Sequence, residues 1–446
     1  MAESNLLLAA LIEQAGLSHA GLAAKINDAA GNCRLRYDHA SVARWIRDHA
    51  IPRDPAPELI CAILGDRLGR DVTLADIGMH QVAAGDRPPT LRQATERAAA
   101  VWHGDARGRD PGSVLVGPPA ISPVWEWENP PEDPDVSHDG HRKADPADVI
   151  YLQQVRTHYQ EMYRRVGGAP VRARLLATLN EQAAPLLRGT YDNELGRRIY
   201  RAAGGLAALA GICAYDADQQ PLAQRHLFAA LRLAKASQDR EFGAYVIAVL
   251  ANQALYLEEN RLVVQYAESA LRRTGSRLAP ALATDLYALM SKAYARMGDT
   301  AACHHTLRRC ERSAASVSAG NGPPEASYVL PGLVETQAAE ALRRLGDLRA
   351  AQTYAEESVR TATATHLRGQ VHRYAGLALV LTANGDLDRS AHAASQMLDR
   401  AVGMESGRVR DRVNTVIQAL RPFRTQPDIA AVLERADDQA RVRGKS

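Results

Sequence analysis

Five arginines cluster within 20 residues near the N-terminus and could supply cationic contacts. They are Arg34, Arg36, Arg44, Arg47 and Arg53. Only Asp38 and Asp48 oppose them between residues 34 and 53, so five minus two leaves a local charge of +3. A guanidinium offers a planar fork of N–H donors, which suits bidentate contact with phosphate oxygens or with a guanine base. Residues 1–80 hold 8 basic and 10 acidic residues, which confines this chemistry to one local face.

The residue types and their spacing do not indicate an enzyme active site or a metal site. The sequence has no Walker-A loop, no GxSxG, no HExxH and no dinucleotide-type glycine turn. The close histidine pairs, His138 with His141 and His304 with His305, have no matching set of carboxylates, and we interpret them as surface residues. The five cysteines form no CxxC pair, which argues against a zinc site or a disulfide framework. We therefore expect no catalytic residue, metal or cofactor, and a protein that is not an enzyme.

The basic stretch falls within a series of short helices. Apolar residues recur at helical spacing from residue 5 to 15, and Gly16 ends that helix. Ser18 is a good N-cap for a second helix, and Asp38 for a third that runs from His39 to about Asp48 with Trp45 on its buried side. A fourth helix is predicted over 56–68 and a short fifth over 74–77. The loop over 29–37 is longer than a tight turn.

The third of these helices resembles a known DNA-reading element. Val42-Ala-Arg-Trp-Ile-Arg47 followed by Pro52 is similar to the recognition helix of the Cro/repressor-type (XRE) helix-turn-helix family, usually V/I-S-R-W-x-R-G-x-x-x-P. Ala43 replaces the family's serine, Asp48 replaces its glycine, and the loop before the helix carries an insertion. The resemblance implies that the N-terminal part of this helix enters the major groove of double-stranded DNA.

The resemblance also implies two sets of DNA contacts. The residues expected to face base edges are His39, Ala40, Ser41, Ala43 and Arg44, with Arg44 placed for a bidentate contact to guanine. The residues expected to hold phosphates are Ser18, Arg34, Arg36, Tyr37, Arg47 and Arg53. For any single arginine the alternative is an ordinary solvated surface residue. Motifs of this kind usually act as dimers on paired half-sites, so we expect a homodimer.

A second region, residues 81–148, reads as a connecting helix followed by a Pro/Gly-rich acidic linker. Residues 104–148 hold 10 acidic and 4 basic residues, and this composition predicts a solvated segment without a regular helix. Trp125 and Trp127 alternate with acids, so an extended segment would turn both rings to one side. It would be either a strap lying on a domain surface or a docking motif for a partner.

The third region, residues 149–446, is patterned as paired helices. Gly298-Asp299, Gly346-Asp347 and Gly385-Asp386 each separate two helical patterns, with glycine as the C-cap and aspartate as the start of the next helix. About five to six such pairs, with small residues at their contact faces, resemble tetratricopeptide repeats that stack into a solenoid. The predicted fold is therefore all-α: a small helix-turn-helix domain (1–80) followed by a tetratricopeptide-like solenoid.

The complete layout resembles the regulators with a helix-turn-helix and tetratricopeptide-like repeats that are abundant in Streptomyces-type actinobacteria. This resemblance implies a role in development or secondary metabolism, and a peptide or small-molecule ligand or protein partner in the repeat groove. Candidate groove residues are Tyr245, Asn252, Gln253, Tyr256, Tyr287 and Tyr294. The alternative is that the tyrosines are spacers between helices and that Asn252 is simply exposed.

These observations favour a cytoplasmic, sequence-specific DNA-binding transcriptional regulator. No apolar run approaches the roughly 20 residues that span a bilayer, and no basic region precedes the first apolar stretch, so we expect neither a membrane span nor a signal peptide. The alternative is an adaptor whose repeats hold a protein partner and whose helix-turn-helix does not bind DNA. The arginine cluster favours DNA, and the charge of 8 − 10 = −2 over residues 1–80 favours the adaptor.

Overall fold

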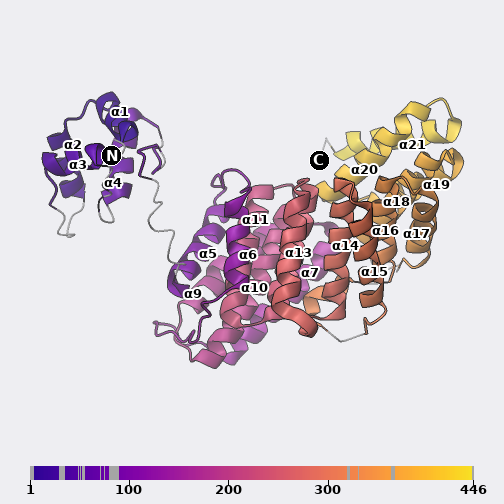
Figure 1. Cartoon of the computed structure of the whole chain (residues 1–446), viewed down its shortest axis with the longest axis horizontal. Coiled ribbons are helices and arrows are strands. Elements are labelled where there is room, and N and C mark those ends of the chain that lie inside the picture. Colours follow the sequence, from indigo (N-terminus) through magenta and orange to yellow (C-terminus); the bar gives the residue numbers. More distant parts are fainter. Residues whose placement is uncertain are drawn as a thin grey trace. The chain divides into compact units, whose positions relative to one another are not determined.

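The computed structural model describes residues 5–29, 36–48, 50, 52, 56–70, 72–74, 76–79, 90–318, 322–329, 331–362 and 367–443. The chain divides into two compact units, Met1–Pro88 and Pro89–Ser446 (Figure 1). The described residues form helices joined by turns, with two isolated β-bridges, so the predicted all-α fold is confirmed. Within them no single helix has the length and apolar composition to cross a membrane, and Leu7–Gln14 with His19–Ala29 meets that test only as a pair bent by 88°.

The first unit is a small bundle of four helices, α1 (Leu6–Gln14), α2 (His19–Ala29), α3 (His39–Arg47) and α4 (Ala56–Leu68). Its core takes fully buried side chains from all four, including Leu8, Leu22, Val42 and Ile60. The predicted bounds of the four helices agree with the structure to within a few residues. Apolar residues three and four apart explain this agreement, because they give each short helix one buried stripe.

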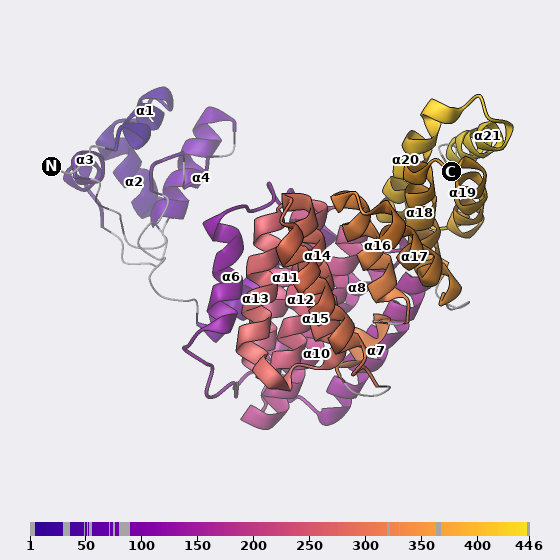
Figure 2. The same ribbon diagram turned by 45° about the vertical axis from the view of Figure 1, so that its right-hand side comes forward.

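The second unit begins with helices that flank the repeats. They are α5 (Leu91–Ala106), α6 (Pro118–Glu128), α7 (Pro146–Val166), α8 (Ala169–Thr178), a π-helical segment (Leu179–Ala183) and α9 (Ala184–Leu187). The repeats are α10 (Asn193–Asp216), α11 (Gln220–Ser237), α12 (Arg240–Tyr256), α13 (Asn260–Thr274), α14 (Pro280–Met297), α15 (Thr300–Ala314), α16 (Leu333–Leu345), α17 (Leu348–Arg360), α18 (Leu367–Asn384), α19 (Leu387–Ala401), α20 (Gly407–Leu420) and α21 (Pro427–Arg443). Successive helices pair and stack side by side (Figure 2).

The Gly-Asp turns have the predicted roles. Gly298, Gly346 and Gly385 take left-handed conformations with φ of 78°, 85° and 78°, and each begins the turn between two paired helices. The aspartate that follows each glycine accepts a hydrogen bond from the backbone of the next helix. In the earlier turns the left-handed positions are held by Asp218, Gln238 and Glu258. No glycine marks these turns in the sequence.

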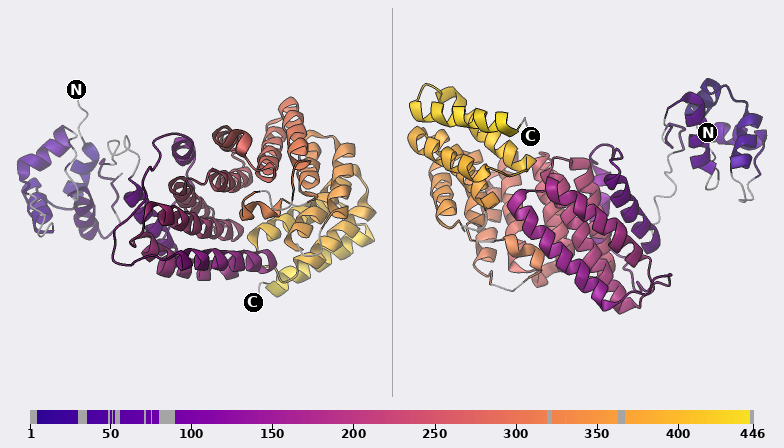
Figure 3. Two further views of the ribbon diagram at one scale, coloured as in Figure 1. Left: turned by 90° about the horizontal axis from the view of Figure 1, so that it is seen from below. Right: turned by 180° about the vertical axis from the view of Figure 1, so that it is seen from behind.

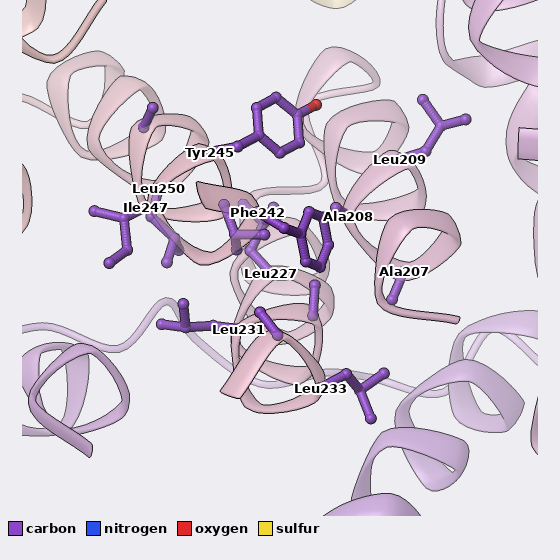
Figure 4. Packing of buried hydrophobic residues seen from close by; sticks show 14 of the residues in the cluster. Ala207, Ala208, Leu209, Leu227, Leu231, Leu233, Phe242, Tyr245, Ile247 and Leu250 are labelled. Carbon is purple, nitrogen blue, oxygen red and sulfur yellow. The ribbon is translucent and has the colours of Figure 1, made fainter. Parts of the chain in front are cut away.

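Close helix contact in the first two repeats depends on small residues. Phe242 of α12 is fully buried between α10 and α11, beside Ala208, Leu227 and Leu231 (Figure 4). A Cβ at Gly204 of α10 would lie 2.8 Å from Cε1 of the Phe242 ring. The absence of a side chain at Gly204 therefore lets the ring reach the backbone of α10.

Elements far apart in the sequence meet near the start of α20. Figure 3 shows, in its left view, α7 extending toward α20. The backbone N–H of Glu405, just before α20, donates to the carbonyl of Val166 at the end of α7 at 3.0 Å. Arg408 of α20 places its guanidinium 3.6 Å from the ring centroid of Tyr256 on α12. The start of α20 is thus held against the end of α7 and against α12.

The prediction of a solvated linker without a regular helix over 104–148 is wrong. Residues Pro118–Glu128 form α6. Pro118 and Pro119 lie in its first turn, where the backbone N–H groups have no intrahelical partner, and Pro123 lies inside the helix. The helix also places the two tryptophans apart, rather than on one side as an extended segment would. Trp127 is buried against Gly243, whereas Trp125 is 61% exposed.

The acidic residues of this segment hold it to the repeats rather than solvating it. Glu126 and Asp133 both contact Arg232 of α11, at 3.3 and 2.7 Å. Glu128 contacts Arg272 of α13 at 2.8 Å, and Glu132 pairs with Arg273. The complementary arginines lie about 100 residues or more away in the sequence, so the local composition gave no sign of them. The structure consequently places the segment within the second unit, which starts at Pro89.

Candidate nucleic-acid interface

The start of α3 is fixed by a clamp from α2. The side-chain amide of Asn27 donates to the carbonyl of Tyr37 at 2.8 Å, and its oxygen accepts from the Tyr37 N–H at 2.9 Å. The Tyr37 ring then meets the Trp45 ring edge to face, with centroids 4.9 Å apart. Trp45 is buried in the core of the unit, so the inner face of α3 is held at both its first and its last turn.

A capping box sets where α3 begins. The Asp38 carboxylate accepts from the backbone N–H and the hydroxyl of Ser41, both at 2.8 Å. These hydrogen bonds from Ser41 lower the pKa of Asp38 below its ordinary value. Ser41 is buried and committed to this cap, so it does not face a base edge. The expectation that Ser41 reads DNA is therefore corrected: it positions α3, because its hydroxyl lies on the inner side of the first turn.

The outward face of α3 is formed by the other residues predicted to meet bases. His39, Ala40 and Arg44 are exposed, and Ala43 is half-buried. They lie three to five positions apart or adjacent on one helix, a spacing that gathers them on a single face. The nine residues of α3 span about 14 Å, which suits a major groove about 12 Å wide. Ala40 and Ala43 have short side chains, which leave room for base edges beside Arg44.

Arginines lie at either side of this face. Arg36 is exposed before the helix, and Arg47 is exposed in its last turn. The Nε of Arg47 contacts Oδ1 of Asp48 at 3.1 Å, so Asp48 offsets one of the cations. Tyr37, in contrast, is half-buried. Its backbone is hydrogen-bonded to Asn27 and its ring packs on Trp45. Arg34 and Arg53 lie outside the described residues.

Ser18 acts as the predicted N-cap of α2. Its hydroxyl oxygen accepts from the Gly21 N–H at 3.0 Å, and the residue is exposed. The first turn of α2 therefore lies at the surface of the unit, where its backbone N–H groups suit an anion. The structure thus brings His39, Ala40, Ala43 and Arg44 onto one face of α3, and it exposes the backbone N–H groups at the start of α2.

Asn5 anchors the far end of α3 and was not found from the sequence. It is buried, its backbone N–H donates to the carbonyl of Ile46 at 2.6 Å, and its side chain donates to the carbonyl of Ile77 at 2.9 Å. Its oxygen also caps α1 by accepting from Leu8 at 3.1 Å. Gly78 has φ of 60° beside it, and a Cβ there would lie 2.5 Å from the Asn5 oxygen. Only the N-cap role had a sequence signal, because the other partners are 41 and 72 positions away.

Three of the six residues expected to line a repeat groove are buried inside the fold. Tyr245 and Tyr287 are buried, the first beside Phe242 and the second under the guanidinium of Arg309, 4.6 Å from its ring centroid. Gln253 is also buried and donates to the backbone oxygen of Gln220 at 2.8 Å. These three side chains therefore do not line an open groove. They serve the spacing between helices, which was the alternative expectation for the tyrosines.

The remaining three groove candidates lie nearer the surface but not as one set. Asn252 is exposed, and Tyr294 is half-buried. Tyr256 donates to the Asp411 carboxylate at 2.7 Å, and burial together with this carboxylate raises the pKa of Tyr256 to about 12. Tyr256 thus belongs to the contact between α12 and α20.

No group of three metal-binding side chains is present within the described ranges. His138, one of the histidines considered above, has its Nδ1 2.7 Å from the Gly189 carbonyl and stacks on the Tyr191 ring. That geometry is a structural contact between the segment before α7 and the turn before α10.

One family model matches the chain, and it does so over the first unit. The match is to the SP15 N-terminal domain and covers residues 8–80 of 446, the part that contains α1 to α4. Neither a curated protein nor a solved structure matches the chain. The first unit is therefore similar to the SP15 N-terminal domain.

Proposed function

We propose that this chain is a sequence-specific DNA-binding transcriptional regulator whose repeat domain senses a ligand and mediates dimerisation. The observation that supports DNA reading is the outward face of α3, with His39, Ala40 and Arg44 exposed on a capped, anchored helix. Arg44 stands beside the two alanines, where its guanidinium can reach the O6 and N7 of a guanine. Arg36 and Arg47 lie where they can hold the phosphates on either side.

The overall charge of the first unit does not attract DNA, so an attraction must come from one part of its surface. Its acidic residues outnumber its basic ones, so binding depends on the α3 face instead of on overall charge. A regulator of this kind reads two half-sites as a dimer, and an inverted repeat in its target would report that symmetry.

The test is a pull-down of genomic fragments with the purified full-length protein, followed by sequencing. We expect enrichment of a short inverted repeat. The Arg44→Ala variant should lose this enrichment, while Arg67→Ala, at an exposed arginine in the last turn of α4, should retain it. No enrichment by the parent protein, or equal enrichment by Arg44→Ala, would contradict the proposal and favour a protein–protein adaptor.

A further inference from the structure

A small pocket with an excess of positive charge opens where three parts of the repeat unit meet. It has a volume of about 250 Å³ and lies among the ends of α14 and α16 and the turn between α12 and α13. Its lining side chains are mostly charged: Glu258, Asn260, Lys292, Arg296, Glu340, Ala341, Arg343 and Arg344. Four cations face two carboxylates, so 4 − 2 gives a charge of +2 in the lining alone.

One carboxylate in this pocket already faces three cations. Glu340 lies 3.2 Å from the Nζ of Lys292 and 3.5 Å from both Arg296 and Arg412, the last of which comes from α20. Burial would raise the pKa of Glu340, but these three cations outweigh burial and hold it well below its usual range. Glu340 is thus ionised, and it cannot neutralise all three of its partners.

The surplus charge is not absorbed by neighbouring acids. Arg343 forms no ion pair with the part of the chain that the structure describes, and burial lowers its pKa. Burial also lowers the pKa of His372 well below its ordinary value, and the cations Arg368, Arg412, Arg408 and Lys292 lower it further. The cations Arg368, Arg412, Arg408 and Lys292 thus all act on one buried side chain next to the pocket.

Two buried polar atoms here lack hydrogen-bond partners among the described residues. They are Oδ1 of Asn260, in the pocket lining, and Nε of Arg412, on the side chain that reaches Glu340. Buried polar atoms are nearly always paired with protein or with water, and the Asn260 oxygen, which lies in the lining, can accept from a hydroxyl group of a bound molecule. A phosphate supplies acceptor oxygens that suit guanidinium groups, and a hydroxyl next to it supplies a donor.

We propose that this pocket binds the phosphate group of a small molecule, held by Lys292, Arg296, Arg343 and Arg344. The volume is below the usual range for drug-sized ligands, about 300 to 1,000 Å³, which favours a compact molecule. This inference rests on the ligand-sensing part of the proposed function and not on DNA binding. A binding measurement without DNA therefore tests it separately, and a failure of DNA recognition would leave it intact.

The test is calorimetric titration of the full-length protein with inorganic phosphate and with ribose 5-phosphate, against sodium chloride at equal ionic strength. We expect saturable binding of the phosphates only. Equal affinities would identify free phosphate as the ligand, and tighter ribose 5-phosphate a phosphate monoester with hydroxyl groups near Asn260. Arg343→Gln should weaken binding at least tenfold, whereas Arg349→Gln, at an exposed arginine of α17, should not change it.

A second variant should change phosphate affinity in the opposite direction. Glu340→Gln removes the resident negative charge, so it should tighten phosphate binding, which a merely structural loss would not do. Far-UV circular dichroism checks that each variant is folded, and Arg343→Gln decides the matter if Glu340→Gln does not fold. The proposal is overturned by binding no stronger than that of chloride, by equal losses in Arg343→Gln and Arg349→Gln, or by weaker binding in a folded Glu340→Gln.

Discussion

The Asp216 carboxylate accepts a hydrogen bond from the Ser406 hydroxyl at 2.7 Å, although the two residues are 190 positions apart. Asp216 is fully buried, accepts from the Gly168 N–H at 2.8 Å and pairs with Arg368. One side chain at the end of α10 therefore joins the turn between α7 and α8 to the start of α18 and the start of α20. Ser406 also caps α20 by accepting from Val409 at 3.1 Å.

Replacing Asp216 should release the C-terminal helices. Asp216→Ala leaves the Arg368 guanidinium without its partner, and we expect a loss of about 3 to 5 kcal/mol. Ser406→Ala removes one partner of the same cluster and should cost about 1 kcal/mol. Hydrogen–deuterium exchange over residues 407–443, with thermal unfolding as the global measure, checks both. Unchanged exchange in Asp216→Ala would show that Asp216 does not hold the C-terminal helices in place.

A substitution of Ser41 tests whether this residue positions α3 or contacts a DNA base. Because its hydroxyl is buried in the capping box of α3, Ser41→Ala should increase amide exchange in α3 and lower stability by about 1 kcal/mol. The DNA sequence preference should remain that of the parent protein. A changed preference in Ser41→Ala, compared by the genomic pull-down, would mean that Ser41 contacts a base after all.

Substitutions of Arg36 and Arg44 should have different effects on DNA binding, one on its salt dependence and the other on its sequence preference. Both are exposed, but Arg36 precedes α3 and is expected to hold a phosphate. Arg36→Ala should weaken binding to all sequences and reduce the slope of log affinity against log salt by about 1. Arg44→Ala should instead reduce discrimination between target and non-target DNA. Fluorescence anisotropy across a salt series measures both, and a loss of discrimination in Arg36→Ala would reverse the assignment.

Asp285 makes the stability of the repeats depend on pH. Burial raises its pKa to about 6, against which the hydrogen bond from Tyr328 and the charge of Lys292 act. The folded state then binds more protons than the unfolded state between about pH 4 and pH 6, so stability falls as pH rises through that window. Asp285→Asn cannot ionise and should gain about 2 to 3 kcal/mol relative to the parent between pH 4 and pH 7. Parallel pH profiles for the two proteins would contradict the prediction.

Two glycines in the repeats should respond in opposite directions. At Gly204, a Cβ would press on the Phe242 ring at 2.8 Å, so Gly204→Ala should destabilise the fold by about 1 to 3 kcal/mol. At Gly376, inside α18, the nearest atom to an added Cβ is the end of the Arg412 side chain at 3.9 Å. Gly376→Ala should therefore stabilise by about 0.5 to 1 kcal/mol through helix propensity. Thermal unfolding of both variants measures the two changes in stability, and a change of the same sign in both would contradict the prediction.

The sequence alone determined the elements whose causes are local. The stripe of apolar residues, the Asp38 cap and the Gly-Asp turns each involve residues a few positions apart, and α3 and the helix pairs of the repeats lie where these signals placed them. The outward face of α3 followed from the same periodicity. Ser41 was misplaced, because spacing alone does not say whether a polar side chain in a first turn points outward or back to the cap.

The tertiary structure decided everything that depends on partners distant in the chain. The acidic segment from Glu126 to Asp133 became part of the second unit because arginines of α11 and α13 compensate its charge. Tyr245 and Tyr287 are buried because residues of other elements pack over them, Tyr328 beside the first and Arg309 over the second. The phosphate pocket unites residues from 258 to 344, and only the folded chain concentrates those charges at one place.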